Sequence, residues 1–397
     1  MHDVVIIGAG PVGLALAVLL AREGLSPVLV ERQPEAALAD PAFDGREIAL
    51  THHSRALLER IGAWDLIPAE AISPLRQARV LNGADPFALT FDTGGAGRGT
   101  EALGFLVANH LIRRALYGVA RSVPAIDLRA GTAVERVATG PAAAELHLAG
   151  GEVLQAPLTV AADTRFSQAR KQMGIAASVR DFRRSMLVCR VEHTAPHGHV
   201  ATEWFDYGQT VALLPLNGGA SSLVLTRAPG EIARLMELPP LAFEAEMTRA
   251  LRRRGLGPVR LASTRHSYPL AATYARHFAS PRFALAGDAA VGMLPITAHG
   301  FNLGLRGAET LADAVAEARR RGGDIGAPAV LRRFEAAHRL ATGPLYAATN
   351  AIAALYSRED LPARLARHAV LRVGGALSPI RQAVSAMLMD RGATPGR

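Results

Sequence analysis

Residues 8–13, Gly-Ala-Gly-Pro-Val-Gly, constrain the fold of this chain more than any other segment. They follow Val4–Ile7, a run of β-branched residues that is typical of a strand buried on both faces. Leu14–Arg22 then has helical spacing and is ended by Gly24, and Pro27–Val30 predicts a second strand. Because crossover connections are right-handed, this βαβ unit predicts two parallel strands.

The glycine spacing is that of a dinucleotide-binding turn. Gly8 permits the tight turn, Gly10 lets backbone amides approach a pyrophosphate, and Gly13 lets the helix pack closely on the strand. The N-terminus of the helix offers amide donors and a positive dipole to phosphate. Glu31, eighteen residues after Gly13, stands where an acid that binds ribose hydroxyls is expected. The residues predicted to bind the dinucleotide are Gly8, Gly10, Pro11, Val12, Gly13, Glu31 and Arg32.

Composition and charge exclude several classes of protein. With 397 residues, of which 49% are hydrophobic, the chain has material for two or three domains and is neither disordered nor collagen-like. The single cysteine, Cys189, excludes an intramolecular disulfide and a cysteine-based metal site. The net charge is +9, but no basic stripe carries interleaved aromatic residues, so we expect no nucleic acid partner.

Two further features are interpreted as structural. Val4–Ala21 is uncharged and resembles a short membrane span, but glycines and a proline interrupt it, and we interpret it as the core of a cytosolic protein. His52 and His53 are adjacent, a spacing that does not suit metal ligands, and we expect them on a solvated loop or helix surface.

The remaining pattern predicts the α/β class. A parallel-sheet domain receives a mostly antiparallel β insertion, and helices follow at the C-terminus. Helices are predicted over 54–61, 109–121 (with Asn109 as the N-cap), 301–321 and 330–390, and strands over 105–107, 158–161, 186–191, 210–214, 221–225 and 283–286.

Two later segments resemble the flavin-dependent aromatic hydroxylases, the family typified by para-hydroxybenzoate hydroxylase. Residues 44–51, Asp-Gly-Arg-Glu-Ile-Ala-Leu-Thr, resemble the family's arginine-bearing segment, which implies that Arg46 contacts the FAD pyrophosphate or ribityl chain. Residues 162–167, Ala-Asp-Thr-Arg-Phe-Ser, resemble its Asp-Gly motif, although Thr164 replaces the glycine. The resemblance implies that Asp163 supports the FAD site and the approach of a reduced nicotinamide.

Residues 287–304 carry the most specific resemblance to this family. A strand delivers Asp288, whose carboxylate can accept hydrogen bonds from ribityl hydroxyls, and a helix that begins near Gly300 aims its amides at the flavin's pyrimidine edge. Residues 300–305, Gly-Phe-Asn-Leu-Gly-Leu, resemble the branch that hydroxylates the ring during ubiquinone biosynthesis. The resemblance implies that Pro295, Gly300, Phe301 and Asn302 line the isoalloxazine ring.

Two positions depart from the family pattern. His299 stands where many relatives carry glutamine, and it suits either a catalytic role, as a proton donor or acceptor or as a residue that orients the substrate, or a role in supporting the backbone. Ala108 stands where relatives usually place a polar residue that contacts the flavin. The sequence has no second GxGxxG unit, so we expect NAD(P)H or another reductant to act as a transient electron donor.

The resemblance implies a domain organisation and a reaction. A Rossmann-like (GR2-type) FAD-binding domain would comprise 1–76, 100–181 and 262–342, a β-sheet substrate domain 77–99 and 182–261, and a helical region 343–397. The reaction would be that of an FAD-dependent monooxygenase, in which reduced FAD and oxygen give a flavin C4a-hydroperoxide that hydroxylates the ring of a polyprenylated phenol or quinol.

The C-terminal region mixes apolar residues with arginines. A cytoplasmic protein that contacts the inner membrane or a biosynthetic complex through this region is one hypothesis, and packing with a solvated arginine face is the other. The arginines concerned are Arg358, Arg364, Arg367, Arg372 and Arg381.

Other functions remain open on the same evidence. A hydroxylase of a soluble aromatic metabolite would act on phenols without a tail and without lipid. A catalytically idle accessory subunit of a quinone-biosynthesis complex would bind FAD but form no oxygen-dependent product. A flavin-linked reductase of isoprenoid double bonds would need no oxygen. Halogenases of this fold use a catalytic lysine. The only lysine here, Lys171, lies just after the Asp-Gly-like motif, so a halogenase is disfavoured.

Overall fold

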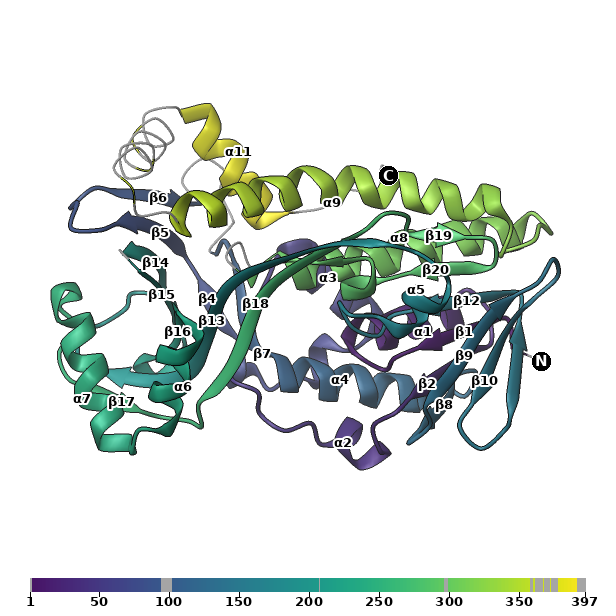
Figure 1. Cartoon of the computed structure of the whole chain (residues 1–397), viewed down its shortest axis with the longest axis horizontal. Coiled ribbons are helices and arrows are strands. Elements are labelled where there is room, and N and C mark those ends of the chain that lie inside the picture. Colours follow the sequence, from purple (N-terminus) through teal and green to yellow (C-terminus); the bar gives the residue numbers. More distant parts are fainter. Residues whose placement is uncertain are drawn as a thin grey trace.

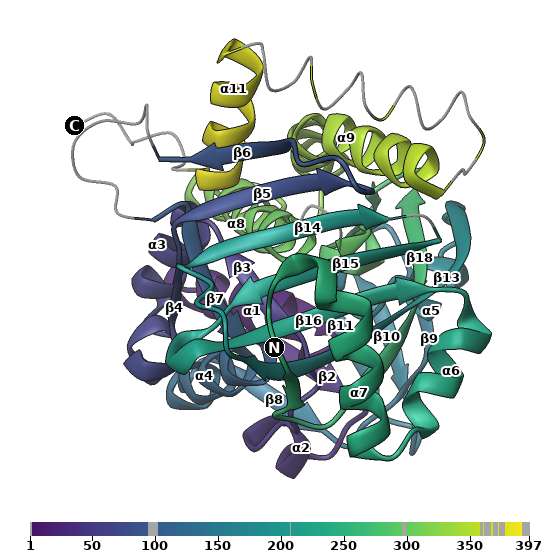
Figure 2. The same ribbon diagram turned by 90° about the vertical axis from the view of Figure 1, so that its left-hand side faces the viewer.

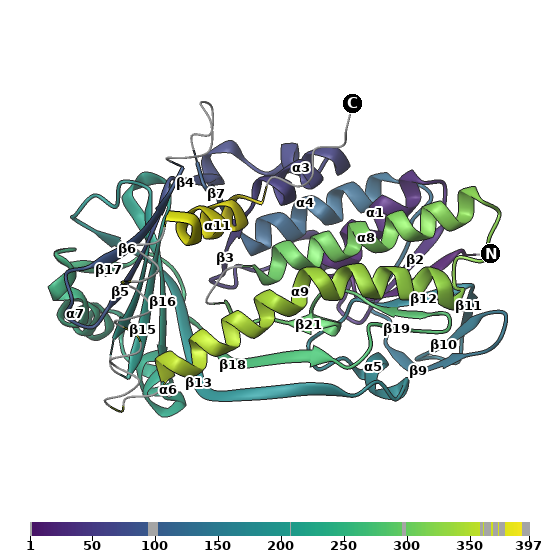
Figure 3. The same ribbon diagram turned by 90° about the horizontal axis from the view of Figure 1, so that it is seen from above.

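The computed structural model describes residues 2–93, 102–206, 208–295, 299–357 and 378–390, together with Asp360, Arg367 and Arg372. Two large sheets lie at opposite ends of the molecule, and strands β13 (Ala177–His193) and β18 (His266–Ala275) run side by side between them (Figure 1). Helix α9 (Pro328–Ser357) extends along the molecule from the first sheet toward the second (Figure 3).

The first sheet has six strands in the order β19-β20-β12-β1-β2-β8. All neighbours are parallel except β19 and β20. Every residue of β1 and β12 is buried, which explains why both strands are continuous runs without alternating polar residues. The strands are β1 (Val4–Ile7), β2 (Pro27–Glu31), β8 (Asp127–Ala130), β12 (Leu158–Ala161), β19 (Ala279–Ser280) and β20 (Phe283–Leu285).

Helices cover this sheet and form one large hydrophobic core with it. They are α1 (Pro11–Arg22), α3 (His52–Ile61), α4 (Asn109–Ser122), α8 (Gly300–Arg320) and α9. Helix α1 begins at Pro11, a residue whose fixed φ suits the first helical position. Helix α3 is capped by Thr51, whose hydroxyl accepts a hydrogen bond from the Ser54 N–H.

The second sheet has nine strands in the order β21-β18-β13-β16-β15-β14-β5-β6, with β17 beside β13. Every pair is antiparallel except β14 and β5. Helices α6 (Pro229–Glu237) and α7 (Pro240–Leu251) cover one face (Figure 2) and pack on Leu187, Cys189 and Trp204 in a second core. The other strands are β5 (Gln77–Asn82), β6 (Ala88–Asp92), β14 (Val200–Asp206), β15 (Gln209–Pro215), β16 (Ala220–Arg227), β17 (Val259–Leu261) and β21 (Val291–Gly292).

Smaller elements complete the described fold. Two three-stranded sheets are formed by β3 (Glu47–Leu50), β7 (Gly104–Ala108) and β4 (Ser73–Leu75), and by β9 (Val134–Thr139), β10 (Ala144–Leu148) and β11 (Val153–Ala156). The remaining helices are α2 (Glu35–Ala39), α5 (Gln168–Gln172) and α11 (Ser378–Met389). No helix in the described part of the chain is long and apolar enough to cross a membrane.

The predicted α/β class, with a parallel sheet and a mostly antiparallel β region, is confirmed. The expectation that Asn109 caps a helix is wrong: Asn109 is the first residue of α4, and its amide donates instead to Asp44 Oδ2 at 2.7 Å. His52 and His53 are the first two residues of α3, so they lie on a helix as expected, but they are half-buried rather than solvated. The His52 ring bonds the Ala102 carbonyl at 2.9 Å, and the His53 ring bonds Glu309 of α8 at 2.8 Å.

Two of the C-terminal arginines named in the sequence analysis have described side chains, Arg367 and Arg372. Arg367 is only 1% exposed, since its guanidinium donates to the backbone carbonyls of Leu355 and Tyr356. Arg372 lies 3.5 Å from Asp85. Arg358, Arg364 and the side chain of Arg381 lie outside the described residues.

Candidate active site

Three loops converge at the carboxyl ends of the parallel strands β1, β12 and β20. Val12, after β1, fills the space beside two glycines: a Cβ on Gly287 would lie 3.0 Å from the Val12 side chain, and one on Gly304 2.9 Å. A Cβ on Gly8 would lie 2.7 Å from the carbonyl oxygen of Ala162, which follows β12. The motifs that the sequence separates by about half the chain therefore meet at one edge of the first sheet.

The glycine turn has the shape of a phosphate cradle. Gly8 has φ +104°, and a Cβ on Gly13 would lie 2.0 Å from the Gly8 carbonyl oxygen, so neither position accepts a side chain without a shift. A Cβ on Gly10 would meet no protein atom within 4 Å. No side chain caps α1, whose first backbone hydrogen bond runs from Leu14 N–H to the Gly10 carbonyl. The N–H groups of the first turn are thus available to an anion, and the residues present fit a dinucleotide.

Glu31 stabilises this turn from the end of β2. Its Oε2 accepts the Ala9 N–H at 2.9 Å and its Oε1 accepts the Gln33 N–H at 2.9 Å. The carboxylate lies where a ribose would follow the pyrophosphate. Arg32, next to it, is exposed.

Arg46 is held in a small polar cluster. Its guanidinium donates to Asp44 Oδ2 at 2.6 Å and lies over the ring of Tyr268, 5.5 Å from the centroid. Burial opposes ionisation of Asp44, but the hydrogen bonds and charge of Arg46, with a bond from Asn109, hold the pKa of Asp44 below its usual value. The charge of Asp288 also acts on Arg46, so the two residues predicted to meet the FAD lie near each other.

Asp288 has a partner that the sequence analysis missed. Arg165 donates to Asp288 Oδ2 from Nη2 at 2.9 Å and from Nε at 3.2 Å, and its Nη1 donates to the Ala271 carbonyl at 2.7 Å. Arg165 belongs to the segment that resembles the Asp-Gly motif, so the motif was visible, but the pairing across 123 residues was not. This bond leaves Oδ1 of Asp288 for a further hydrogen bond.

Asp163 lies in the loop after β12, which Arg170 joins to the loop after β20. Burial raises the pKa of Asp163, against hydrogen bonds from Ser167 and from backbone amides. Arg170 is 3% exposed and donates to the carbonyls of Arg165 and Ala289, at 3.1 and 2.8 Å, so it joins the loop after β12 to the loop after β20. Oδ1 of Asp163 is buried and has no hydrogen-bond partner among the described residues. Buried polar atoms usually have a partner, so this oxygen suits a bound ligand.

The N-terminus of α8 lies beside these loops. His299 is 6% exposed, and its carbonyl accepts the first backbone bond of the helix, from Leu303 N–H at 2.9 Å. The side chain of Asn302 accepts the Thr51 N–H at 3.1 Å and donates to the Ala49 carbonyl at 2.8 Å, which fastens α8 to β3 and α3. The side chain of Asn302 is therefore used within the protein.

The other residues predicted for the site lie near α8, β7 and β12. Gly300 is the first residue of α8. Pro295 is exposed and is the last described residue before 296–298, which lie outside the described residues. Ala108 is buried at the end of β7 and offers no polar side chain. Thr164 is exposed, and its hydroxyl accepts the Phe166 N–H at 3.3 Å.

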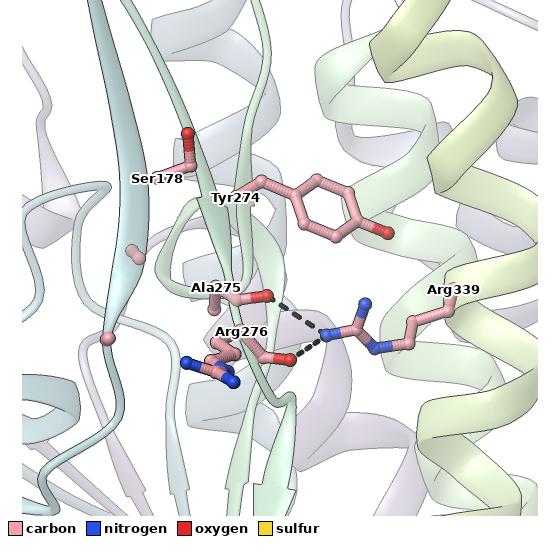
Figure 4. Close-up of a pocket in the computed structure, with 7 residues that line it drawn as sticks. Ser178, Tyr274, Ala275, Arg276 and Arg339 are labelled. Atoms are coloured by element: carbon pink, nitrogen blue, oxygen red, sulfur yellow. Dashed lines mark hydrogen bonds between the residues drawn. The ribbon is translucent and has the colours of Figure 1, made fainter.

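A cavity lies elsewhere in the molecule. It has a volume of about 430 Å³ and is lined by β13, β18 and α9, with Ser178, Tyr274 and Arg339 among its residues (Figure 4). Arg339 donates to the Ala275 carbonyl at 3.2 Å and also to that of Arg276, so its charge is used in joining α9 to β18. None of the sequence-predicted site residues lines this cavity.

Fold and site together define an FAD-dependent aromatic hydroxylase. The family model described as FAD binding domain matches residues 1–331. The solved structure of p-nitrophenol 4-monooxygenase PnpA from Pseudomonas putida DLL-E4 superposes with a TM-score of 0.79 at 19% identity, over 99% of both chains, which supports the fold.

Curated relatives narrow the family. Ubiquinone hydroxylase UbiM of Neisseria meningitidis is 44% identical over 388 residues, which cover 97% of this chain and 84% of the relative. Ubiquinone hydroxylase UbiL of Rhodospirillum rubrum is 35% identical over 96% of this chain and 87% of the relative. The chain belongs to the FAD-binding domain family and, within it, to the ubiquinone hydroxylases.

Proposed function

We propose that this enzyme hydroxylates the aromatic ring of a polyprenylated phenol or quinol in ubiquinone biosynthesis. The observation that carries the proposal is the convergence of the Gly10 turn, Asp163, Asp288 and the N-terminus of α8 at one edge of the parallel sheet. The similarity to enzymes named ubiquinone hydroxylases supports the choice of substrate class.

The chain's own residues would hold FAD in a defined order. Gly10 and the first turn of α1 would bind the pyrophosphate, Glu31 the ribose, and Arg46 with Asp288 the ribityl region. The N–H groups of Phe301 and Asn302 would meet the pyrimidine edge, where negative charge collects. The remaining cofactor residues of the proposal are Gly8, Pro11, Val12, Gly13, Arg32, Asp163, Pro295 and Gly300.

When bound, FAD supplies the reducing equivalents and the activation of oxygen that ring hydroxylation needs. The protein must hold the ring of the substrate against the flavin and keep water away. The β-sheet region 77–99 and 182–261 would supply this cover, with the FAD-binding regions 1–76, 100–181 and 262–342 beneath it. NAD(P)H or another reductant would bind transiently.

His299 is the proposed proton donor or acceptor. Its burial at the start of α8 suits that role and suits support of the backbone as well. The variant His299→Gln retains a polar side chain but cannot titrate. If His299 accepts a proton, the variant should lose the acidic limb of the pH–rate profile, and if His299 donates one, the variant should lose the alkaline limb. An unchanged profile would assign His299 to backbone support.

The test of the proposal uses the flavin-loaded protein, chemically reduced and then exposed to air. One sample contains a prenylated phenol, a second contains the same ring without its tail, and a third contains neither. We expect a hydroxylated ring in the first sample. Equal product from the tail-free phenol would favour a soluble metabolite as substrate, and reoxidation without any product would favour an accessory subunit.

A polyprenylated substrate resides in a membrane, so we further propose peripheral contact with a membrane surface or a biosynthetic complex. The side chain of Arg372, in the C-terminal region, is exposed and forms an ion pair with Asp85 at 3.5 Å. Cosedimentation with anionic vesicles at low salt tests direct contact. A protein that stays in the supernatant would exclude it.

A further inference from the structure

The nine-stranded sheet has an inner face, opposite α6 and α7, that looks toward the candidate FAD site. Arg190 on this face donates to Glu47 at 2.6 and 2.8 Å, and Tyr268 donates to the Asp44 carbonyl at 2.8 Å. A Cβ on Gly45 would lie 3.3 Å from the side chain of Val188. Because residues 44–47 flank Arg46, the inner face adjoins the flavin-binding segment.

Strand register places Glu203 on this inner face. Glu203 pairs with Val80 on one side and Ala212 on the other, and Ala212 pairs in turn with Val224. The next residue, Trp204, belongs to the core under α6 and α7, and side chains alternate along a strand. The carboxyl group of Glu203 therefore lies among apolar side chains that run across the strands, those of Val80, Ala212 and Val224.

No charged group among the described residues compensates this carboxyl group. Burial alone raises the pKa of Glu203 to about 8, although the residue remains partly accessible. Among the described residues, β5, β6, β15 and β16 place no ionisable side chain on the inner face. Ionisable groups on this side of the sheet are Arg190, Glu192, His266 and Tyr268 on β13 and β18. Tyr356 of α9 stacks on Phe205 with 3.7 Å between ring centroids, and the buried Arg367 lies over the ring of Tyr356, 5.2 Å from its centroid.

A second unsatisfied polar group lies beside Glu203. Asn82 pairs with Phe205, two residues along β14, so it shares the inner face and stands roughly 8 Å from Glu203 by the spacing of strands and residues. It is 1% exposed, and neither its Oδ1 nor its Nδ2 has a hydrogen-bond partner among the described residues. A buried amide without a partner is costly, and a ligand with polar atoms removes that cost.

We propose that Glu203 and Asn82 bind the oxygen substituents of the substrate's ring, while Val80, Ala212 and Val224 pack against its apolar surface. This inference rests on the proposed function and adds the residues that select the ring. A protonated carboxyl group and an amide each donate as well as accept, so together they suit hydroxyl, methoxy or keto oxygens. A ring without such oxygens would leave both groups unsatisfied, and a site of this kind discriminates strongly against it.

The test measures binding rather than turnover. The probe is a prenylated dimethoxybenzene, whose ring oxygens only accept hydrogen bonds, and the reference is the prenylated benzene without them. Both are titrated into the oxidised, flavin-loaded enzyme and followed by the change in flavin absorbance. We expect Glu203→Leu to weaken binding of the dimethoxy probe by about tenfold and to leave the reference unchanged. Asn82→Leu should act in the same direction, and Glu192→Gln, an exposed carboxyl group on β13, should act on neither.

The pH dependence separates recognition by Glu203 from a structural role. Since the dimethoxy probe cannot donate, its affinity should fall as pH rises through about 8 in the wild type and stay constant in Glu203→Gln. Folding gives a second readout. The pKa of Glu203 is raised from 4.5 in the folded state, so ionisation of this group opposes folding increasingly between pH 4.5 and about 8, and the stability of Glu203→Gln relative to the wild type should rise across this range.

The possible results have distinct meanings. A folded, flavin-loaded Glu203→Leu variant that binds both probes as the wild type does would overturn the inference. Binding of the dimethoxy probe that depends on Glu203, in an enzyme that oxygenates no prenylated phenol, would support the inference and contradict the proposed function. A wild type that binds neither probe would contradict both.

Discussion

The two sheets prepare their binding surfaces by different means. At the first sheet, the cradle is made by the backbone: Gly8, Gly10 and Gly13 act through the absence of a side chain, and the helix offers its N–H groups. At the second sheet, the inner face is made by alternate side chains from several strands, such as Glu203 and Val224. A backbone cradle binds the common parts of a cofactor, whereas a side-chain surface can change with the substrate while the fold stays the same.

Substitutions in the glycine turn give the sharpest test of a backbone cradle. Gly13→Ala should destabilise the protein by about 2–3 kcal/mol and abolish FAD retention, because its Cβ would lie 2.0 Å from the Gly8 carbonyl oxygen. Gly10→Ala is the matched control for folding, since Gly10 has φ −71° and its Cβ would meet no protein atom within 4 Å. Its apoprotein should unfold as the wild type does, while FAD binds about tenfold more weakly or worse. Tight FAD binding by Gly10→Ala would contradict the cradle.

The core beneath the first sheet contains a buried histidine that should make its stability depend on pH. Burial, with a smaller effect of Arg306, lowers the pKa of His338 from 6.5 to about 4. Because the unfolded chain binds the proton first, the contribution of His338 to stability should be full above pH 6.5 and fall by roughly 2–3 kcal/mol as pH decreases toward 4. Urea unfolding at several pH values measures this. His338→Leu should lack most of the decline, and His277→Gln, at an exposed position, should retain it.

The joint, by which we mean the contact between β13 of the nine-stranded sheet and β3, contains an ion pair whose carboxylate is buried. The Glu47 side chain is 1% exposed and accepts two hydrogen bonds from Arg190. Glu47→Gln should destabilise the protein by about 2 kcal/mol, because Arg190 keeps its charge and loses its partner. The exposed pair of Arg320 and Glu23 is the control, for which Glu23→Gln should cost less than about 1 kcal/mol. Equal effects in chemical unfolding would mean that the joint contributes no more than a surface contact.

The smallest expected effect concerns a side chain at the backbone cradle. Asp288→Asn should weaken FAD binding by about tenfold, since it removes the charge that pairs with Arg165 and keeps the size of the side chain. Arg165→Gln should cost a similar factor, and the double variant should cost less than the product of the two. Fluorescence titration of apoprotein with FAD measures all three. An unchanged affinity in Asp288→Asn would remove Asp288 from the site.

The parts of the molecule that local sequence determines were predictable. The β1–α1–β2 unit and the helix after Gly300 contain glycines and apolar runs that determine the conformation of the backbone nearby. Both elements are found within a few residues of the prediction. Strand β13 is longer than predicted, because residues 177–185 are largely exposed and charged and lack the pattern of a buried strand. Helices α6 and α7 were not predicted, although each begins with a proline.

The contacts between distant residues were not predictable from one sequence. Arg165 meets Asp288 because the loops after the neighbouring strands β12 and β20 lie side by side, and Arg190 meets Glu47 because β13 packs against β3. Glu203 had no local signal either, since a single acid in a strand is ordinarily solvated on the open face. Its environment becomes visible only from the strand register, which brings Val80 and Ala212 to its sides.

The most direct test of the proposed ring hydroxylation follows the oxygen atoms of O₂ into the products. The reduced, flavin-loaded enzyme is exposed to isotopically labelled oxygen gas in the presence of a prenylated phenol, and the product is examined by mass spectrometry. The account predicts one labelled oxygen atom on the aromatic ring, with little release of hydrogen peroxide. An unlabelled ring, with all the oxygen recovered as peroxide, would contradict it.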